Sequence, residues 1–237
     1  MHLRKITLLS FLIALSVVMS IWLVYFVDVQ FHMNLYRFGN HPLHSNGIVG
    51  IFLSPFIHSS SDPGHILNNT LPTFILFWML FYHYRIIATK SLVFIWIFTG
   101  LGLWVLGRDS YHIGMSSIIY GLSAFLTFSG FFRKSLRVAG ISLLVIFLYG
   151  SMVWGIFPIK EGISWEGHLS GLTAGVIAAL IFRKSPPQPH KMTYEIEEEM
   201  GIEPFGDYWK EESEVPAALD SARSSAASAS DLNPPEK

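Results

Sequence analysis

Long apolar stretches alternate with short polar segments along most of this chain. A bilayer core roughly 30 Å thick is crossed by about 20 mostly apolar residues in a helix. Stretches close to this length occupy residues 6–27, 65–84, 91–107, 114–132, 137–157 and 166–182. The first has no charged residue and no small-residue cleavage site after it, so we expect it to be retained as a helix. The pattern predicts an all-α membrane domain of six transmembrane helices over residues 1–184.

Charge divides the chain into two parts. Charged residues make up 14% of the sequence, against roughly 25% in an ordinary soluble domain. The overall net charge of −1 combines +7 in residues 1–184 (12 basic, 5 acidic) with −8 in residues 185–237 (4 basic, 12 acidic). The second part opens with Ser185-Pro-Pro-Gln-Pro and is rich in Ser and Ala near its end. We expect residues 185–237 to form an acidic, disordered cytoplasmic tail.

The connections between the predicted helices differ in basic residues. With the N-terminus in the cytoplasm, nine Lys and Arg of the membrane domain fall on the cytoplasmic side and three on the outer side. This bias is the usual one for membrane proteins, so we expect a multi-pass protein of the cell membrane with both termini in the cytoplasm. The five acidic residues of the domain all fall on the outer side, and we expect none of them on the inward face of a helix.

The first outer connection, about residues 28–64, is long for a compact protein. Loops of this length usually carry function or structure of their own. It contains the apolar stretch Ile48–Ile57, which is too short to span a bilayer and is interrupted by Pro55. We expect this loop to be partly embedded in the membrane interface or in the protein.

Polar residues gather where the second, fourth and sixth predicted helices begin. The second carries His65 and Asn69, the fourth Ser116 and Tyr120, and the sixth His168. All three helices enter from the outer side, so these residues lie within one or two turns of it, at a similar depth. Residues four apart share a helix face. The sequence therefore predicts that the five side chains can converge on one pocket.

These side chains suit acyl transfer. A serine hydroxyl becomes a nucleophile when a neighbouring base accepts its proton, and His168 can serve Ser116 in this way. The Ser116 amide, His65 and Asn69 are candidate donors to the oxyanion of the tetrahedral intermediate. With no carboxylate expected nearby, Tyr120 could pack against the His168 ring and hold it. The absence of cysteine excludes a thiol nucleophile, disulfides and thiolate metal sites.

Small residues are spaced for close helix contact. Gly171 and Gly175 form Gly-x-x-x-Gly on the sixth predicted helix, and Ser117 and Gly121 have the same spacing on the fourth. Small residues at this spacing allow membrane helices to approach closely. Close packing of these two helices would also bring Ser116 to His168.

The assembled motifs resemble the rhomboid family of intramembrane serine proteases over about residues 45–182. Ser54-Pro-Phe-Ile-His58 with His65-x-x-x-Asn69 is similar to the family's loop and second helix. The family's nucleophile segment is similar to His112-Ile-Gly114-Met-Ser116-Ser117-Ile-Ile-Tyr120-Gly121 of this chain. The family's last helix, which carries the base, is similar to Gly167-His168-Leu-Ser-Gly171-x-x-x-Gly175. The family's usual Gly-x-Ser-Gly has serine at its fourth position here, at Ser117. Ser116 is the expected nucleophile, since it precedes Tyr120 by four residues.

The resemblance implies Ser116 as nucleophile and His168 as general base, with His65 and Asn69 near the oxyanion and Gly114 and Tyr120 in support. It implies a six-helix bundle with a water-accessible cavity open to the outer side and a lateral entrance at the fifth helix. The expected partners are the lipid bilayer and transmembrane protein substrates with small-residue cleavage sites, with no nucleic acid. No cofactor and no metal are implied.

Two other functions are compatible with the residues. A catalytically silent rhomboid-like protein would bind membrane clients, although such relatives typically lose the serine or the histidine, and both remain here. A small transporter could use His65, Asn69 and His168 as a proton or solute path, although transporters often contain internal repeats and none stands out here. The sequence leaves the substrate and the oligomeric state open.

Overall fold

The computed structural model describes residues 2–133, 136–159, 162–185 and 201. Of the two units into which the chain divides, Met1–Gln188 and Pro189–Lys237, the first contains all the described residues except Gly201. Within the described residues there is no strand, only an isolated antiparallel bridge between Asn40 and His112. The all-α class is therefore confirmed for this part of the chain. The predicted acidic tail falls outside the described residues, except for Ser185 and Gly201.

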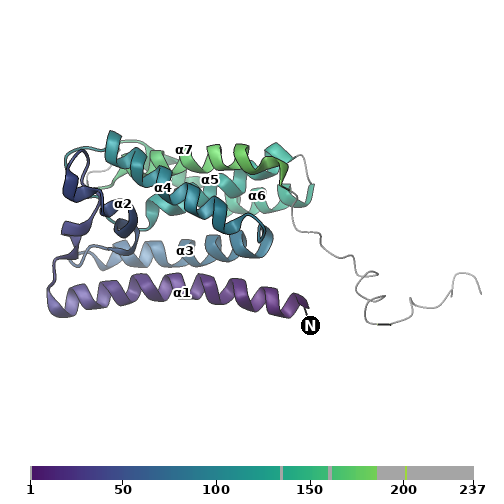
Figure 1. Cartoon of the computed structure of the whole chain (residues 1–237), viewed down its shortest axis with the longest axis horizontal. Coiled ribbons are helices and arrows are strands. Elements are labelled where there is room, and N and C mark those ends of the chain that lie inside the picture. Colours follow the sequence, from purple (N-terminus) through teal and green to yellow (C-terminus); the bar gives the residue numbers. More distant parts are fainter. Residues whose placement is uncertain (1, 134–135, 160–161, 186–200, 202–237) are drawn as a thin grey trace, which may run out of the picture. The chain divides into compact units, whose positions relative to one another are not determined.

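Each predicted span coincides with a long helix. The six helices are α1 (His2–Phe31), α3 (Pro63–His83), α4 (Ala88–Leu106), α5 (Ser116–Arg133), α6 (Leu136–Tyr149) and α7 (Trp165–Ile181). The 3₁₀ helix η4 (Gly150–Ile156) continues from α6, and η5 (Phe182–Lys184) follows α7. Figure 1 shows the long helices side by side, with α1 at one edge next to α3.

Four segments of the described residues are long and apolar enough to cross a membrane. They are Lys5–Phe31, Ala88–Leu106, Ala139–Ile156 and Trp165–Lys184. Helices α3 and α5 are not among them. The first turns of α3 carry polar side chains, and ten of the 18 residues of α5 are buried. A helix enclosed by protein does not need the apolar surface that contact with lipid requires, which accounts for the weaker hydropathy of α5.

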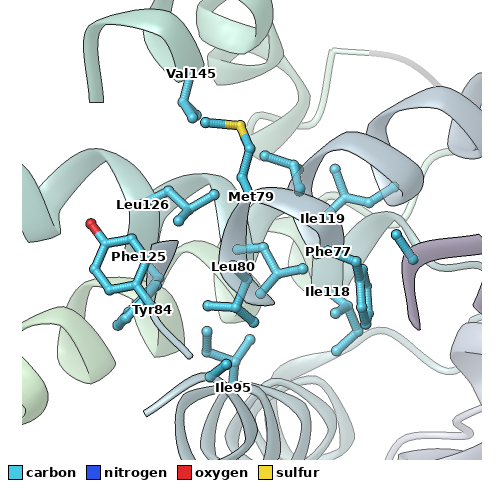
Figure 2. Close-up of a cluster of buried hydrophobic side chains, with 14 of the residues drawn as sticks. Phe77, Met79, Leu80, Tyr84, Ile95, Ile118, Ile119, Phe125, Leu126 and Val145 are labelled. Atoms are coloured by element: carbon cyan, nitrogen blue, oxygen red, sulfur yellow. The ribbon is translucent and has the colours of Figure 1, made fainter. Parts of the chain in front are cut away.

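Helix α5 lies at the centre of the bundle. It packs against α3, α4, α6 and α7, and its contact with α7 is the most extensive in the molecule. Its buried residues, among them Phe125, join a core with side chains from α3, α4 and α6, of which Phe77, Leu80, Ile95 and Val145 are labelled in Figure 2. The nucleophile candidate thus begins the most enclosed helix.

Glycines permit the close approach of α5 and α7. A Cβ atom added at Gly171 would overlap the backbone carbonyl of Ser117, and one added at Gly175 would overlap the carbonyl of Gly121. Because these are backbone atoms, they cannot move aside without separating the helices. The two glycines therefore set the distance between the helices that carry Ser116 and His168.

The long first loop is built from short helices: η1 (Leu35–Phe38), η2 (Ser45–Gly47), α2 (Gly50–Leu53) and η3 (Ser54–Phe56). Helix α2 packs against α4, where Ile51 lies over Gly100. Buried Asn40 donates from Nδ2 to the Gly100 carbonyl at 2.8 Å and exchanges two backbone hydrogen bonds with His112. These bonds tie the loop to the segment that leads into α5.

Candidate active site

Ser116 occupies the first position of α5, directly after a backbone turn at Gly114. The helix begins at Ser116, so the predicted start at residue 114 is two residues too early. Gly114 has φ of 109°, in the region that favours glycine, and its N–H donates to the Ser54 carbonyl at 2.9 Å. A Cβ at Gly114 would also lie 2.5 Å from His65 Nε2. Glycine is required here by its conformation and by the ring beside it.

Ser116 and His168 meet across the α5–α7 interface. The Ser116 Oγ lies 2.8 Å from His168 Nε2, although the two residues are 52 positions apart in the chain. His168 is 7% exposed and lies in the first turn of α7. This distance is that of a good hydrogen bond and is the geometry that general-base activation of a serine requires.

The His168 ring is held on two further sides. Its Nδ1 lies 2.9 Å from the carbonyl oxygen of Gly155 in η4. Tyr120, one turn beyond Ser116, stacks on the ring with centroids 4.1 Å apart and planes 8° from parallel. The Tyr120 hydroxyl in turn donates to the Met152 carbonyl at 2.6 Å.

The proton positions on His168 follow from these partners. A carbonyl oxygen can only accept, so Nδ1 carries the proton, and Nε2 is left as the acceptor for the Ser116 hydroxyl. Gly155 and Met152 were not predicted as site residues, because a main-chain acceptor leaves no signal in residue type.

His65 and His58 lie on the other side of the nucleophile turn. The Ser59 N–H donates to His65 Nδ1 at 3.4 Å, which places the His65 proton on Nε2, the atom that faces Gly114. The Met115 N–H donates to His58 Nε2 at 3.4 Å, and the two histidine rings are 5.0 Å apart. His58 belongs to the Ser54–His58 motif, but no role was predicted for it.

His58 is a neutral structural histidine in the loop before α3. The pKa of His58 is lowered from 6.5 to about 4, mainly by burial and also by the nearby His65, while the hydrogen bond to the Phe56 carbonyl opposes the shift. It is 1% exposed. His58 therefore supports the backbone of Met115 as an acceptor and does not carry charge at neutral pH.

Asn69 is buried one turn from His65 on α3. Its Nδ2 donates to the His65 carbonyl at 2.8 Å, so one of its two N–H groups is used within its own helix. The second N–H of the same Nδ2 points in a different direction, so Asn69 still has a donor for another acceptor. The structure thus brings the five predicted side chains to the same ends of α3, α5 and α7.

Ser117, at the position where the resemblance leads one to expect glycine, lies against Gly167 of α7. The Ser117 Oγ lies so close to the Cα of Gly167 that a Cβ there would be 2.5 Å from it. Gly167 on α7 therefore provides the space that the Ser117 side chain occupies. This arrangement distinguishes Ser117 from Ser116, whose hydroxyl contacts His168.

The expectation about acidic side chains was wrong for two residues. Glu166 is 5% exposed in the first turn of α7, and Asp28 is 4% exposed near the end of α1. Glu166 Oε1 lies 3.7 Å from Arg108 Nε, and Asp28 accepts from the Leu35 N–H. Their burial depends on partners from other segments, which helix periodicity cannot identify. Neither replaces the Gly155 carbonyl as the partner of His168 Nδ1.

One group among the described residues brings three possible metal ligands together. His41, His44 and Asp109 place ligand atoms within 4.8 Å of one another. The two rings stack with centroids 3.8 Å apart and planes 5° from parallel, so their nitrogen lone pairs do not converge. His41 Nε2 is 2.7 Å from Asp109 Oδ1, and His44 Nδ1 is 2.9 Å from the Pro42 carbonyl. Hydrogen bonding accounts for this group without a metal ion.

Fold and site together define a helical membrane protein with a partly buried serine–histidine pair at the ends of two closely packed helices. Residues 45–185 match the rhomboid domain. This chain belongs to the rhomboid family.

Relatives from bacteria and a virus support this assignment. An uncharacterized Mycobacterium tuberculosis protein is 34% identical over 177 residues, which are 70% of this chain and 72% of that protein. An uncharacterized Mycobacterium leprae protein is 31% identical over 188 residues, 74% of this chain and 70% of that protein. A protein of Acanthamoeba polyphaga mimivirus that is named as a rhomboid protein is 25% identical over 140 residues, 57% of this chain and 75% of its own. Family and apolar helices together identify a multi-pass membrane protein.

Proposed function

We propose that this protein is an intramembrane serine endopeptidase that cleaves transmembrane protein substrates with a Ser116–His168 dyad. The observation that carries the proposal is the 2.8 Å hydrogen bond between Ser116 Oγ and His168 Nε2. Membership of a family that generally consists of intramembrane serine proteases supports it. So does the tautomer of His168, which leaves Nε2 free to accept the serine proton.

The geometry supports the following acylation. Ser116 Oγ attacks the carbonyl carbon of the scissile peptide bond while its proton passes to His168 Nε2. The resulting tetrahedral intermediate collapses as the C–N bond breaks, and Nε2 returns the proton to the leaving amine. Water then attacks the acyl ester in the same way, with His168 again accepting and returning a proton. No cofactor or metal takes part in these steps.

Donors for the oxyanion lie around the nucleophile turn. The first N–H groups of a helix have no partner within that helix, so the Ser116 N–H is available at the start of α5. His65 Nε2 carries a proton and faces Gly114 next to Ser116, and Asn69 retains a second N–H. We assign the oxyanion to these three groups, each of which would contribute about 3 kcal/mol of transition-state stabilisation.

In the membrane, the six long helices all span the bilayer. The bias in Lys and Arg supports a topology with both termini in the cytoplasm and the dyad toward the outer side of a cell membrane. Helix α5 crosses as an enclosed element of the bundle, since it packs against four other helices. The substrates are transmembrane segments with small residues at the cleavage site.

The decisive experiment compares two adjacent serines. In proteoliposomes containing a transmembrane substrate, Ser116→Ala and His168→Ala should abolish cleavage, whereas the matched control Ser117→Ala should retain it. A fluorophosphonate should label the wild type and Ser117→Ala but not Ser116→Ala. Full cleavage by Ser116→Ala would overturn the mechanism.

The same experiment separates the alternative functions. A protein that binds clients without cutting them would retain the substrate in co-purification and would not be labelled in any variant. Solute flux in substrate-free liposomes that survives Ser116→Ala would identify a transporter. Either result contradicts the proposed protease.

A further inference from the structure

In the described part of the chain, no acidic side chain pairs with His168 Nδ1. The partner of this nitrogen comes from the 3₁₀ helix η4. In serine hydrolases with three catalytic residues, the third holds the histidine in the tautomer that lets it act as a base, and a wrong tautomer is costly. Here the acceptor is the Gly155 carbonyl, 2.9 Å from Nδ1. Carbonyls in the last turn of a helix lack intrahelical donors, and Gly155 is the penultimate residue of η4. Its oxygen is therefore available to a side chain.

The same residue sets the position of Tyr120. A Cβ added at Gly155 would overlap the Tyr120 hydroxyl and lie 3.2 Å from His168 Nδ1. Tyr120 can stack on the His168 ring and donate to the Met152 carbonyl only because position 155 has no side chain. The η4 segment thus contacts the edge of the His168 ring directly, and it holds Tyr120 against the face of the same ring.

We propose that Gly155 is the positioning residue of the dyad, in place of a third catalytic side chain. This inference rests on the proposed protease function. The Gly155 carbonyl fixes the tautomer of His168, and the missing side chain leaves space for the tyrosine that clamps the ring. Met152 contributes through its carbonyl, so its side chain can vary without effect on the clamp.

Two simpler explanations for a glycine at this position do not fit. Gly155 is not among the glycines with positive φ, which are Gly114, Gly162 and Gly201 in the described chain, so its backbone conformation is open to alanine. The atoms that a Cβ would meet belong to Tyr120 and His168 side chains rather than to the backbone of a neighbouring helix. Close helix packing therefore does not explain it either.

The test uses Gly155→Ala in the full chain, with Gly150→Ala as the matched control in the same 3₁₀ helix. A Cβ at Gly150 would meet only Ile146 Cγ2, at 3.7 Å, which is ordinary contact. Gly155→Ala should lower kcat and the rate of fluorophosphonate labelling of Ser116 by about 10²-fold, the cost of a misplacement near 1 Å. KM should change by less than about twofold, because the substrate site itself is intact. Gly150→Ala should behave as wild type.

A second substitution tests the cause of that loss. Tyr120→Phe removes the hydroxyl that the new Cβ would overlap but keeps the stacked ring. Tyr120→Phe alone should lower the labelling rate only about two- to fivefold, since it loses a single hydrogen bond. The double variant G155A/Y120F should label at least about tenfold faster than Gly155→Ala, because the overlap is gone. This comparison holds even if Gly155→Ala alone is poorly folded, since the double variant can be measured against Tyr120→Phe.

The outcomes separate this inference from the proposed function. If the wild type is not labelled at Ser116, the protease proposal fails. If the wild type is labelled and Gly155→Ala is labelled at the rate of Gly150→Ala, only the role of Gly155 is overturned. A loss in Gly155→Ala that Tyr120→Phe does not relieve would also overturn it, because the steric path through Tyr120 would then be wrong.

Discussion

At the scale of single residues, the active geometry depends on positions where a side chain is absent. Gly114, Gly155 and Gly167 lie against His65, the Tyr120–His168 pair and Ser117, respectively. Each of these glycines allows a polar side chain to reach a place that a methyl group would fill. The geometry of the dyad therefore depends on these glycines as well as on Ser116 and His168.

Gly114→Ala should abolish most activity. Its φ of 109° is costly for alanine, by about 1–3 kcal/mol, and the new Cβ would press on the His65 ring. Cleavage and fluorophosphonate labelling should both fall by at least about tenfold, with a lower thermal midpoint in detergent. The matched control is Gly140→Ala on α6, where a Cβ would meet nothing within 4 Å. Equal activity of the two variants would contradict the role assigned to Gly114.

At the scale of elements, the α5–α7 contact couples stability to catalysis. The interface is dominated by backbone approaching backbone at Gly171 and Gly175, which leaves no flexible atom to absorb extra volume. Such interfaces respond to overpacking as a unit, because one helix must shift along its length. The dyad spans this same interface.

Gly171→Ala should therefore reduce stability and activity together. The added Cβ meets the Ser117 carbonyl, so we expect a loss of about 1–3 kcal/mol in the free energy of unfolding. Widening the interface also stretches the hydrogen bond from Ser116 to His168, which should lower kcat. Thr173→Ala, an exposed position on the same helix, is the control and should match the wild type in both measurements. An active, fully stable Gly171→Ala would show that the interface can relax.

At the scale of the whole molecule, buried neutral histidines make stability depend on pH. His58 has a folded pKa of about 4 against 6.5 in a model peptide. Below pH 6.5 the unfolded chain binds a proton that the folded chain does not, so the stability present above 6.5 is lost progressively down to about pH 4. At 1.36 kcal/mol for each pKa unit, this amounts to about 3 kcal/mol.

We expect the thermal midpoint in detergent to fall between pH 7.5 and pH 5.0 for the wild type. His58→Gln should show a smaller fall, because glutamine can accept from the Met115 N–H but takes up no proton. Burial also lowers the pKa of His112, and this contribution is common to both proteins. An equal fall in both proteins would mean that His58 is protonated in the folded state.

The helical class, the approximate limits of the six long helices and the family were all predictable from the amino-acid sequence. These follow from the length and periodicity of apolar stretches, which reflect the environment of each helix. The sequence also indicated which polar side chains lie at a similar depth below the outer surface of the membrane, because this depth follows from the distance of a residue from the end of its helix. Ser116, His168, His65, Asn69 and Tyr120 were all named on that basis.

How these residues are held in place depends on contacts between segments that are distant in the chain. The partner of His168 Nδ1 is the carbonyl of Gly155, and main-chain acceptors are present at every position of every sequence. Whether one is free depends on where a 3₁₀ turn ends and which helix faces it. The burial of Glu166 and the direction of the Ser117 side chain likewise depend on neighbours from distant segments. Residue type and spacing specify a helix face, whereas contacts between helices fix the atoms that meet on it.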